Sequence, residues 1–107
     1  MKHVQKRRKN IEREKKDLCK FFNEIGIEYE QKGDLIQING KLTYFLQGGE
    51  FDPLELSITT KNNIHVDFEN YDNTLIVYAF DSAYYDEHLV FLHVKLEYRN
   101  EVLYIRF

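Results

Sequence analysis

Three side chains that can bind metals or transfer protons alternate along one short segment of the chain. His65, Asp67 and Glu69 are each two residues apart, so in a β-strand they would lie on one face. Neutral imidazole and carboxylate groups are suitable ligands for zinc or manganese. Same-face neighbours of a strand are, however, roughly 6.5–7 Å apart, and polar alternation is typical of any half-exposed strand. We therefore expect a solvated polar face and no metal here.

The other reactive side chains form no catalytic arrangement in the sequence. We find no Ser–His–Asp or Cys–His combination, and no glycine-rich phosphate loop with its Lys. His88 and His93 have opposite parity within one strand, so they cannot share a face. Cys19 is predicted to be a packing residue in a helix, and a thiolate activated by neighbouring lysines is the alternative. We expect neither enzymatic activity nor a cofactor.

Basic residues are concentrated at the start of the chain. Residues 1–20 hold nine of the fifteen Lys and Arg but three of the eighteen Asp and Glu, so their net charge is +6, and that of residues 21–107 is −9. A solvated helix is one explanation for these bases, since pairs such as Glu12–Lys16 stabilise helices. The basic residues that could instead bind the phosphates of a nucleic acid or an acidic partner are Lys6, Arg7, Arg8, Lys9, Arg13, Lys15 and Lys16.

Acidic and tyrosine side chains in the second half of the chain form the other candidate site. Tyr is enriched at protein interfaces because it contributes a large contact area at a low entropic cost. An ordinary polar connection is the alternative for residues 81–87. The residues that we predict to bind a protein partner are Asp67, Glu69, Asp81, Tyr84, Tyr85, Asp86 and Glu87.

A short amphipathic helix should precede the rest of the fold. Leu18, Phe22 and Ile25 are spaced four and then three residues apart, which predicts a helix over about residues 17–25 with one buried face. Gly26 is well placed to end it. Val4 and Ile11 are the only apolar side chains that follow Met1 in residues 1–16, so we predict a basic helical extension there that contributes little to stability. Residues 17–107 should form a single α+β domain.

After the helix, the apolar pattern changes to a period of two, which indicates β-strands. We predict one helix packed on an antiparallel sheet, a meander of about five to seven strands, because a single helix provides no parallel crossovers. Residues 75–80 are apolar on both faces and predict a central strand, preceded by a turn at Asp72-Asn73. Residues 89–98 predict one long strand.

Two further turns are predicted from residue types and from matching of faces. Asn39-Gly40 supplies two residues that tolerate positive φ, as a type I′ hairpin turn requires. A two-residue turn at Asn100-Glu101 would place all the facing apolar residues of a C-terminal hairpin on one buried side. The facing pairs would be Tyr98 with Leu103, Leu96 with Ile105, and Val94 with Phe107.

The composition favours a cytoplasmic protein. The single Cys cannot form an intramolecular disulfide, which points to a reducing compartment. The basic N-terminal residues lead into no apolar stretch of the kind a secretory signal needs. The longest apolar run, residues 75–80, is far shorter than a membrane span, so we expect no membrane association.

Taken together, charge and composition favour a binding module. We expect a small intracellular protein whose acidic, tyrosine-bearing surface docks onto a basic surface of another protein, as an inhibitor or modulator of a nuclease or other nucleic-acid-handling protein would. Lys, Asn, Ile, Tyr and Phe are abundant and Ala occurs twice, a bias of AT-rich genomes that suggests a phage or mobile-element protein of anti-defence type. The alternative is a nucleic-acid-binding protein that uses the basic N-terminal helix.

Overall fold

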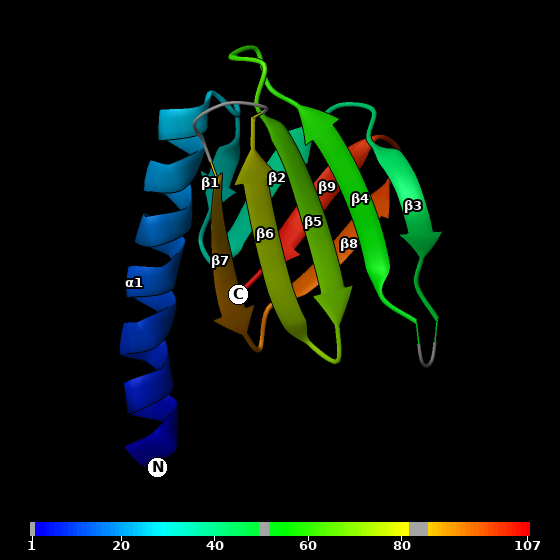
Figure 1. Ribbon diagram of the computed structural model, residues 1–107. Helices are drawn as coiled ribbons and strands as arrows, with labels where there is room; N and C mark the ends of the chain where they lie inside the picture. Colours follow the sequence, from blue (N-terminus) through cyan, green and yellow to red (C-terminus); the bar gives the residue numbers. More distant parts are fainter. Residues whose placement is uncertain (1, 50–51, 82–85) are drawn as a thin grey trace.

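The computed structural model of the chain describes residues 2–49, 52–81 and 86–107, with side chains from residue 10 onward. Within these ranges one α-helix precedes nine β-strands (Figure 1). The elements are α1 Lys2–Ile25, β1 Glu30–Lys32, β2 Leu35–Asn39, β3 Thr43–Gln47, β4 Leu54–Thr59, β5 His65–Tyr71, β6 Thr74–Phe80, β7 Asp86–Leu92, β8 Lys95–Arg99 and β9 Val102–Arg106.

The strands form two antiparallel sheets. β3 to β7 follow one another as a five-stranded meander, and the four-stranded sheet has the order β1-β2-β9-β8. In Figure 1 the five-stranded sheet lies in front of the other, and α1 stands along one side of the pair. The predicted α+β class, with one helix and antiparallel strands, is confirmed. The division into two sheets was not predicted; it arises because β8 and β9 return to the sheet that β1 and β2 began.

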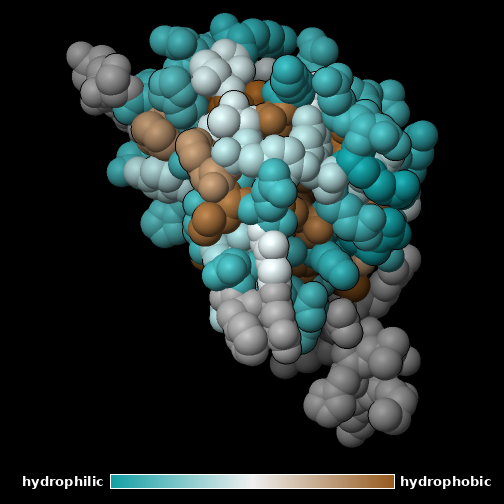
Figure 2. Space-filling model, turned by 90° about the vertical axis from the view of Figure 1, so that its right-hand side faces the viewer, coloured by the Kyte–Doolittle hydropathy of each residue, from teal (hydrophilic) through white to brown (hydrophobic). Residues whose placement is uncertain are grey.

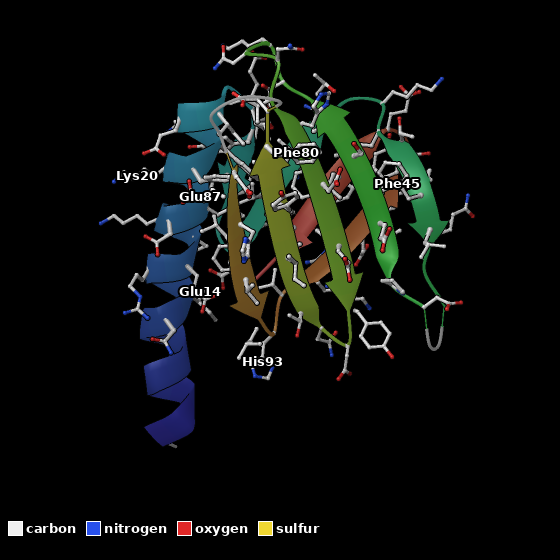
Figure 3. All side chains as sticks on the ribbon, viewed as in Figure 1. Glu14, Lys20, Phe45, Phe80, Glu87 and His93 are labelled. Atoms are coloured by element: carbon white, nitrogen blue, oxygen red, sulfur yellow. The ribbon has the colours of Figure 1, made fainter. Side chains whose placement is uncertain are left out.

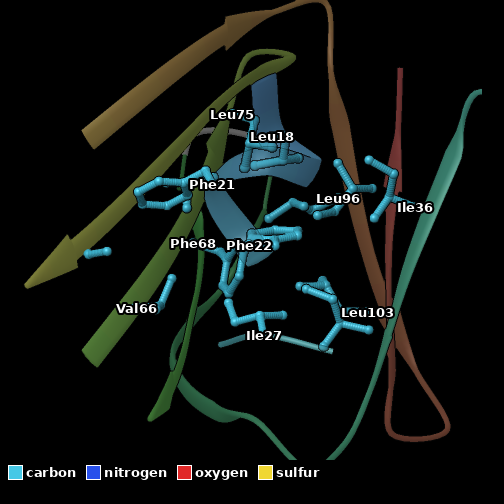
Figure 4. Packing of buried hydrophobic residues seen from close by; sticks show 14 of the residues in the cluster. Leu18, Phe21, Phe22, Ile27, Ile36, Val66, Phe68, Leu75, Leu96 and Leu103 are labelled. Carbon is cyan, nitrogen blue, oxygen red and sulfur yellow. The ribbon is translucent and has the colours of Figure 1, made fainter. Parts of the chain in front are cut away.

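The hydrophobic core lies between the two sheets, and α1 packs into it. Leu18, Phe22 and Ile25 are fully buried, which confirms the predicted apolar stripe. The ring of Phe22 lies 6.2 Å from that of Phe68 on β5, and Figure 4 shows Phe22 between Phe68 and Leu103 of the four-stranded sheet. Because a buried large apolar side chain stabilises a fold by roughly 1.5–3 kcal/mol, these contacts anchor the helix to both sheets.

α1 ends at Gly26, as predicted. Gly26 has a φ of +87°, and the N–H groups of Gly26 and Ile27 both donate to the carbonyl oxygen of Phe22 at 2.9 Å. These bonds satisfy a carbonyl that would otherwise lack a partner at the helix end. In the part of the chain that the structure describes, no helix is both long and apolar enough to cross a lipid bilayer.

The predicted hairpin at Asn39-Gly40 is wrong. β2 pairs with β1 and β9, whereas β3 pairs with β4 in the other sheet, so residues 40–42 cross between the sheets. The hydroxyl of Tyr98 stabilises this crossing, because it donates to the Gly40 carbonyl at 2.9 Å and accepts from the Leu42 N–H at 2.8 Å. β9 occupies the side of β2 at which a hairpin partner would have paired.

The C-terminal hairpin has the predicted turn and register. Residues 100 and 101 have φ values of 54° and 61°, as a two-residue type I′ turn requires. β8 and β9 pair Tyr98 with Leu103 and Leu96 with Ile105. Leu96, Leu103 and Ile105 are buried, so the matching of buried faces predicted the register correctly.

The predicted long strand over residues 89–98 is wrong, because the chain changes sheets at His93. This residue has a φ of 61° and separates β7 of one sheet from β8 of the other. The N–H of Val94 then donates to the carbonyl oxygen of Asn73 at 2.9 Å. That carbonyl belongs to the turn between β5 and β6, at residues 72–73, where both residues have positive φ and the predicted turn is confirmed.

Next to this break, the side chain of Asn70 on β5 links the two sheets. Its amide nitrogen donates to the carbonyl oxygens of Thr74 and Val94, both at 3.0 Å, and its side-chain oxygen accepts from the N–H of Leu96 at 3.2 Å. Leu96 lies in β8. One side chain therefore satisfies three backbone groups where the chain crosses from sheet to sheet.

Candidate protein-binding surface

The outer side of the five-stranded sheet, which faces away from the core, carries three of the predicted protein-binding residues, Asp67, Glu69 and Asp86. Alternate residues of β5 and β6, such as Phe68 and Val77, are buried, so their neighbours point outward. We call the outward side chains of β4 to β7 the acidic face: Glu55, Ser57, Thr59, His65, Asp67, Glu69, Tyr71, Thr74, Ile76, Tyr78, Phe80, Asp86, His88, Val90 and Leu92. It has four carboxylates and, among its described residues, no Lys or Arg.

The strand register arranges this face in rows. Asp67 pairs with Tyr78, which pairs with His88 on β7, so an acid, a phenol and an imidazole lie side by side. A second row runs from Glu69 through Ile76 to Val90, and a third from His65 through Phe80 to Asp86. Neighbouring strands are about 4.8 Å apart. Each acidic side chain therefore has an apolar or aromatic side chain on the adjacent strand or on the next strand but one.

Four rings on β5, β6 and β7 form a continuous ridge near one end of the acidic face. Tyr78 stacks on Phe80 with 5.0 Å between ring centroids, His65 lies 5.4 Å from Phe80, and His88 lies 6.1 Å from Tyr78. His65 Nδ1 is also 3.1 Å from the hydroxyl oxygen of Thr59. These contacts join the four rings into one connected aromatic surface.

The electrostatics of the ridge are set by the acids around it. The hydrogen bond to Asp86 raises the pKa of the Tyr78 phenol above its ordinary value, and partial burial and the negative charges of Asp86 and Asp67 act in the same direction. The phenol is therefore protonated throughout the physiological pH range and remains a hydrogen-bond donor. Among the described residues, no three His, Cys, Asp or Glu side chains come close enough together to hold a metal ion.

The structure brings together some of the predicted protein-binding residues and separates others. Asp67, Glu69 and Asp86 all lie on the acidic face. Glu87 pairs with the buried Ala79, so it lies on the other side of β7 and points toward the helix side of the molecule (Figure 3). Asp81 follows β6 and is half-buried. The predicted residues Tyr84 and Tyr85 lie outside the described residues.

Sequence reasoning missed the aromatic ridge. Residues 75–80 were predicted to be a central strand because both faces are apolar, and β6 is central, between β5 and β7. The buried face uses Leu75, Val77 and Ala79. One signal could have revealed the ridge: the two large rings of this segment, Tyr78 and Phe80, are both at even-numbered positions, which alternate with the buried ones and so share the outer face.

The outer side of the four-stranded sheet has the opposite character. We call its outward charged side chains the basic face: Lys32, Lys95, Arg99 and Arg106, with Glu30 and Glu97. Glu97 lies 3.7 Å from the Nε atom of Arg99 and 3.9 Å from that of Arg106. The guanidinium of Arg99 also lies 4.7 Å above the ring of Tyr104, a cation–π distance.

The predicted basic residues of the helix fall into separate groups. Arg13 and Lys16 are exposed, whereas the side chains of Lys6, Arg7, Arg8 and Lys9 lie outside the description. Lys15 is 4% exposed, so the structure contradicts its prediction as a residue free to bind a partner. Its Nζ atom lies 2.7 Å from Asp34 Oδ1, 3.0 Å from Glu12 Oε1 and 3.1 Å from the Gly33 carbonyl oxygen.

These contacts show that the charge of Lys15 is used within the fold, where it pairs with α1 and with the turn between β1 and β2. The hydrogen bond to Asp34 raises the pKa of Lys15 above its ordinary value, against the opposing effect of burial. Cys19, one turn further along α1, is buried, which confirms it as a packing residue. Burial raises the pKa of its thiol, so the thiolate alternative has no support from its surroundings.

The chain matches no protein-family model, no curated protein and no solved structure.

Proposed function

We propose that this protein is a small protein-binding module that inhibits or modulates a nucleic-acid-handling protein by docking its acidic face onto a basic surface of that partner. One observation carries the proposal. Four carboxylates share the acidic face with a ridge of four contacting rings, and no Lys or Arg lies among the described residues of this face. The composition typical of AT-rich genomes supports a phage or mobile-element protein of anti-defence type as one instance.

Both components of the acidic face favour a protein partner. Carboxylates attract a basic surface and accelerate its approach, while aromatic and aliphatic side chains provide contact area that is desolvated on binding. Val90 and Leu92, beside the ridge, are 55% and 64% exposed. The same carboxylates would repel a nucleic acid. A protein that binds nucleic acid, in contrast, presents Lys and Arg side chains that pair with phosphates, and these cations also pair with carboxylates.

The test is capture of a partner from extract of the native host by the immobilised protein, followed by binding measurements with the purified partner. The triple variant Asp67→Lys, Glu69→Lys, Asp86→Lys should weaken the complex at least about tenfold, because it reverses three of the four charges on the docking surface. Circular dichroism should show an unchanged fold, since none of the three side chains is buried.

A matched triple variant controls for net charge. Glu24→Lys, Glu28→Lys, Glu101→Lys changes the charge by the same amount at exposed positions outside the acidic face, and it should bind nearly as well as the wild type. Equal losses in the two triple variants would mean that overall charge, and not the acidic face, determines binding. A captured partner that binds both variants unchanged would overturn the proposal.

A second function, nucleic-acid binding through the helix, is favoured by one observation. α1 is a continuous helix from Lys2, and in Figure 1 its first turns extend beyond the sheets. The basic residues 6–9 lie on these turns, and Arg13 and Lys16 are exposed further along the helix, so basic side chains along α1 could reach phosphates. Reversal of Lys6, Arg7, Arg8 and Lys9 to Glu tests it. A shift of DNA or RNA by the wild type that this variant loses would establish the helix as the site.

A further inference from the structure

The two sheets have four edge strands, and three of them are protected by charge. Edge strands expose unpaired backbone N–H and C=O groups, and proteins commonly place charged residues there to prevent pairing with other chains. β1 contains Glu30 and Lys32, β7 begins with Asp86 and Glu87, and β8 contains Lys95, Glu97 and Arg99. β3, with the sequence Thr-Tyr-Phe-Leu-Gln, has no charged residue.

β3 is also exposed along its whole length and mostly apolar. All five of its residues are exposed, and Tyr44, Phe45 and Leu46 are 40%, 57% and 45% accessible. These three adjacent residues are half of the large hydrophobic side chains that are exposed in the described part of the chain. Figure 2 views the molecule from the β3 side and shows apolar atoms at its surface, and Figure 3 marks Phe45 at this edge.

We propose that β3 is a self-association edge, at which two copies of this chain pair antiparallel through β3. A second copy fits because the strand is uncharged: a two-fold antiparallel pairing brings no like charges opposite one another. Threonine, tyrosine and phenylalanine, three of its five residues, also suit strand pairing. The uncharged edge can thus pair with a second copy without placing any charged side chains opposite one another.

The size of the edge sets the strength of the pairing. Five residues bury less than the roughly 1,200–2,000 Å² of a standard stable interface, and the register irregularity between Tyr44 and Leu46 limits the regular ladder. The dimer should therefore form reversibly and dissociate on dilution.

The two-fold axis that relates two antiparallel strands stands perpendicular to the sheet. The acidic faces of both copies would therefore lie on one side of a continuous sheet. This inference does not depend on the proposed function.

Sedimentation of the full-length protein over a wide concentration range tests the proposal. The wild type should shift from monomer to dimer as concentration rises. Phe45→Lys should remain monomeric, because it places two like charges at the paired edge. Leu92→Lys is the matched control: it replaces a 64% exposed side chain of another strand and should dimerise like the wild type.

Hydrogen exchange provides an independent measurement in the unmodified protein. Exchange of β3 amides should slow as concentration rises, while that of β1 amides should stay constant. Should Phe45→Lys fail to fold by circular dichroism, Thr43→Lys replaces it, since Thr43 is exposed on the same strand. A wild type that remains monomeric throughout, or a folded β3 variant that dimerises equally well, would overturn the inference. Neither result bears on partner binding by the acidic-face variants.

Discussion

The ammonium group of Lys15 is almost completely removed from water and donates hydrogen bonds to three oxygen atoms. A protein interior tolerates such a charge only when it is paired. Lys15→Ala should therefore lower the free energy of unfolding by about 1–3 kcal/mol, as measured by urea denaturation. Lys16→Ala, at the exposed neighbouring position, is the control and should change it by less than about 0.5 kcal/mol. Equal effects would contradict a structural role for Lys15.

The same contacts predict how the contribution of Lys15 depends on pH. Folding raises the pKa of Lys15 above its ordinary value of 10.5. A group whose pKa is raised by folding stabilises the protein fully below its unfolded pKa, and this contribution is lost as the pH rises through the folded value. The difference in unfolding free energy between wild type and Lys15→Ala should thus be constant near neutral pH and shrink above pH 10.5. A difference that disappears near neutral pH would exclude this ion pair as its source.

The sequence predicts the environment of some residues better than that of others. Cys19 adjoins the apolar stripe of Leu18 and Phe22, so local periodicity is sufficient to predict its burial. Lys15 has no such local signal, because its partner Asp34 is 19 residues further along the chain. Its burial follows from the docking of α1 against the turn between β1 and β2, which periodicity within the helix does not describe.

At the scale of elements, turn chemistry predicts a turn but not which strands it joins. Asn100-Glu101 forms the expected hairpin because the residues on both sides bury the same face against one core. Asn39-Gly40 has stronger turn residues, yet β9 takes the place beside β2, and that pairing joins residues far apart in the chain. The break at His93 was missed for a related reason: a non-glycine residue with positive φ has little signal in sequence.

The link between the sheets at Asn70 can be tested by substitution. Asn70→Ala leaves three part-buried backbone groups without their side-chain partner, so we expect the free energy of unfolding to fall by about 1–3 kcal/mol. Exchange of the amide of Leu96 should also accelerate more than that of amides in the meander. Asn39→Ala, at an exposed position of β2, should have little effect. If both variants were equally stable, Asn70 would not hold the sheets together.

For the whole molecule, charge asymmetry is partly visible in the sequence. Counting residues separates a basic start from an acidic remainder, but it cannot show that the acidic remainder is divided again. Alternation along the strands, combined with the pairing of β8 and β9 next to β2, gathers Lys95, Arg99 and Arg106 on one outer face. The meander gathers Asp67 and Glu69 on the other. Pairing between distant strands produces this division, and no local pattern specifies it.

The division of charge predicts how salt and charge reversal act on association with a basic partner. The two outer faces are separated by two sheets that pack about 10 Å apart, and further by their own side chains. This separation exceeds the Debye length of about 8 Å at physiological ionic strength.

The triple reversal on the acidic face should therefore lower the association rate constant about tenfold or more and flatten its dependence on salt. Reversal of Lys95, Arg99 and Arg106 to Glu should change the rate constant by less than about threefold, because those charges are screened from the docking surface. Stopped-flow mixing at several salt concentrations measures both. A rate constant that falls only when the basic face is reversed would place the docking surface on the four-stranded sheet and exclude the acidic face.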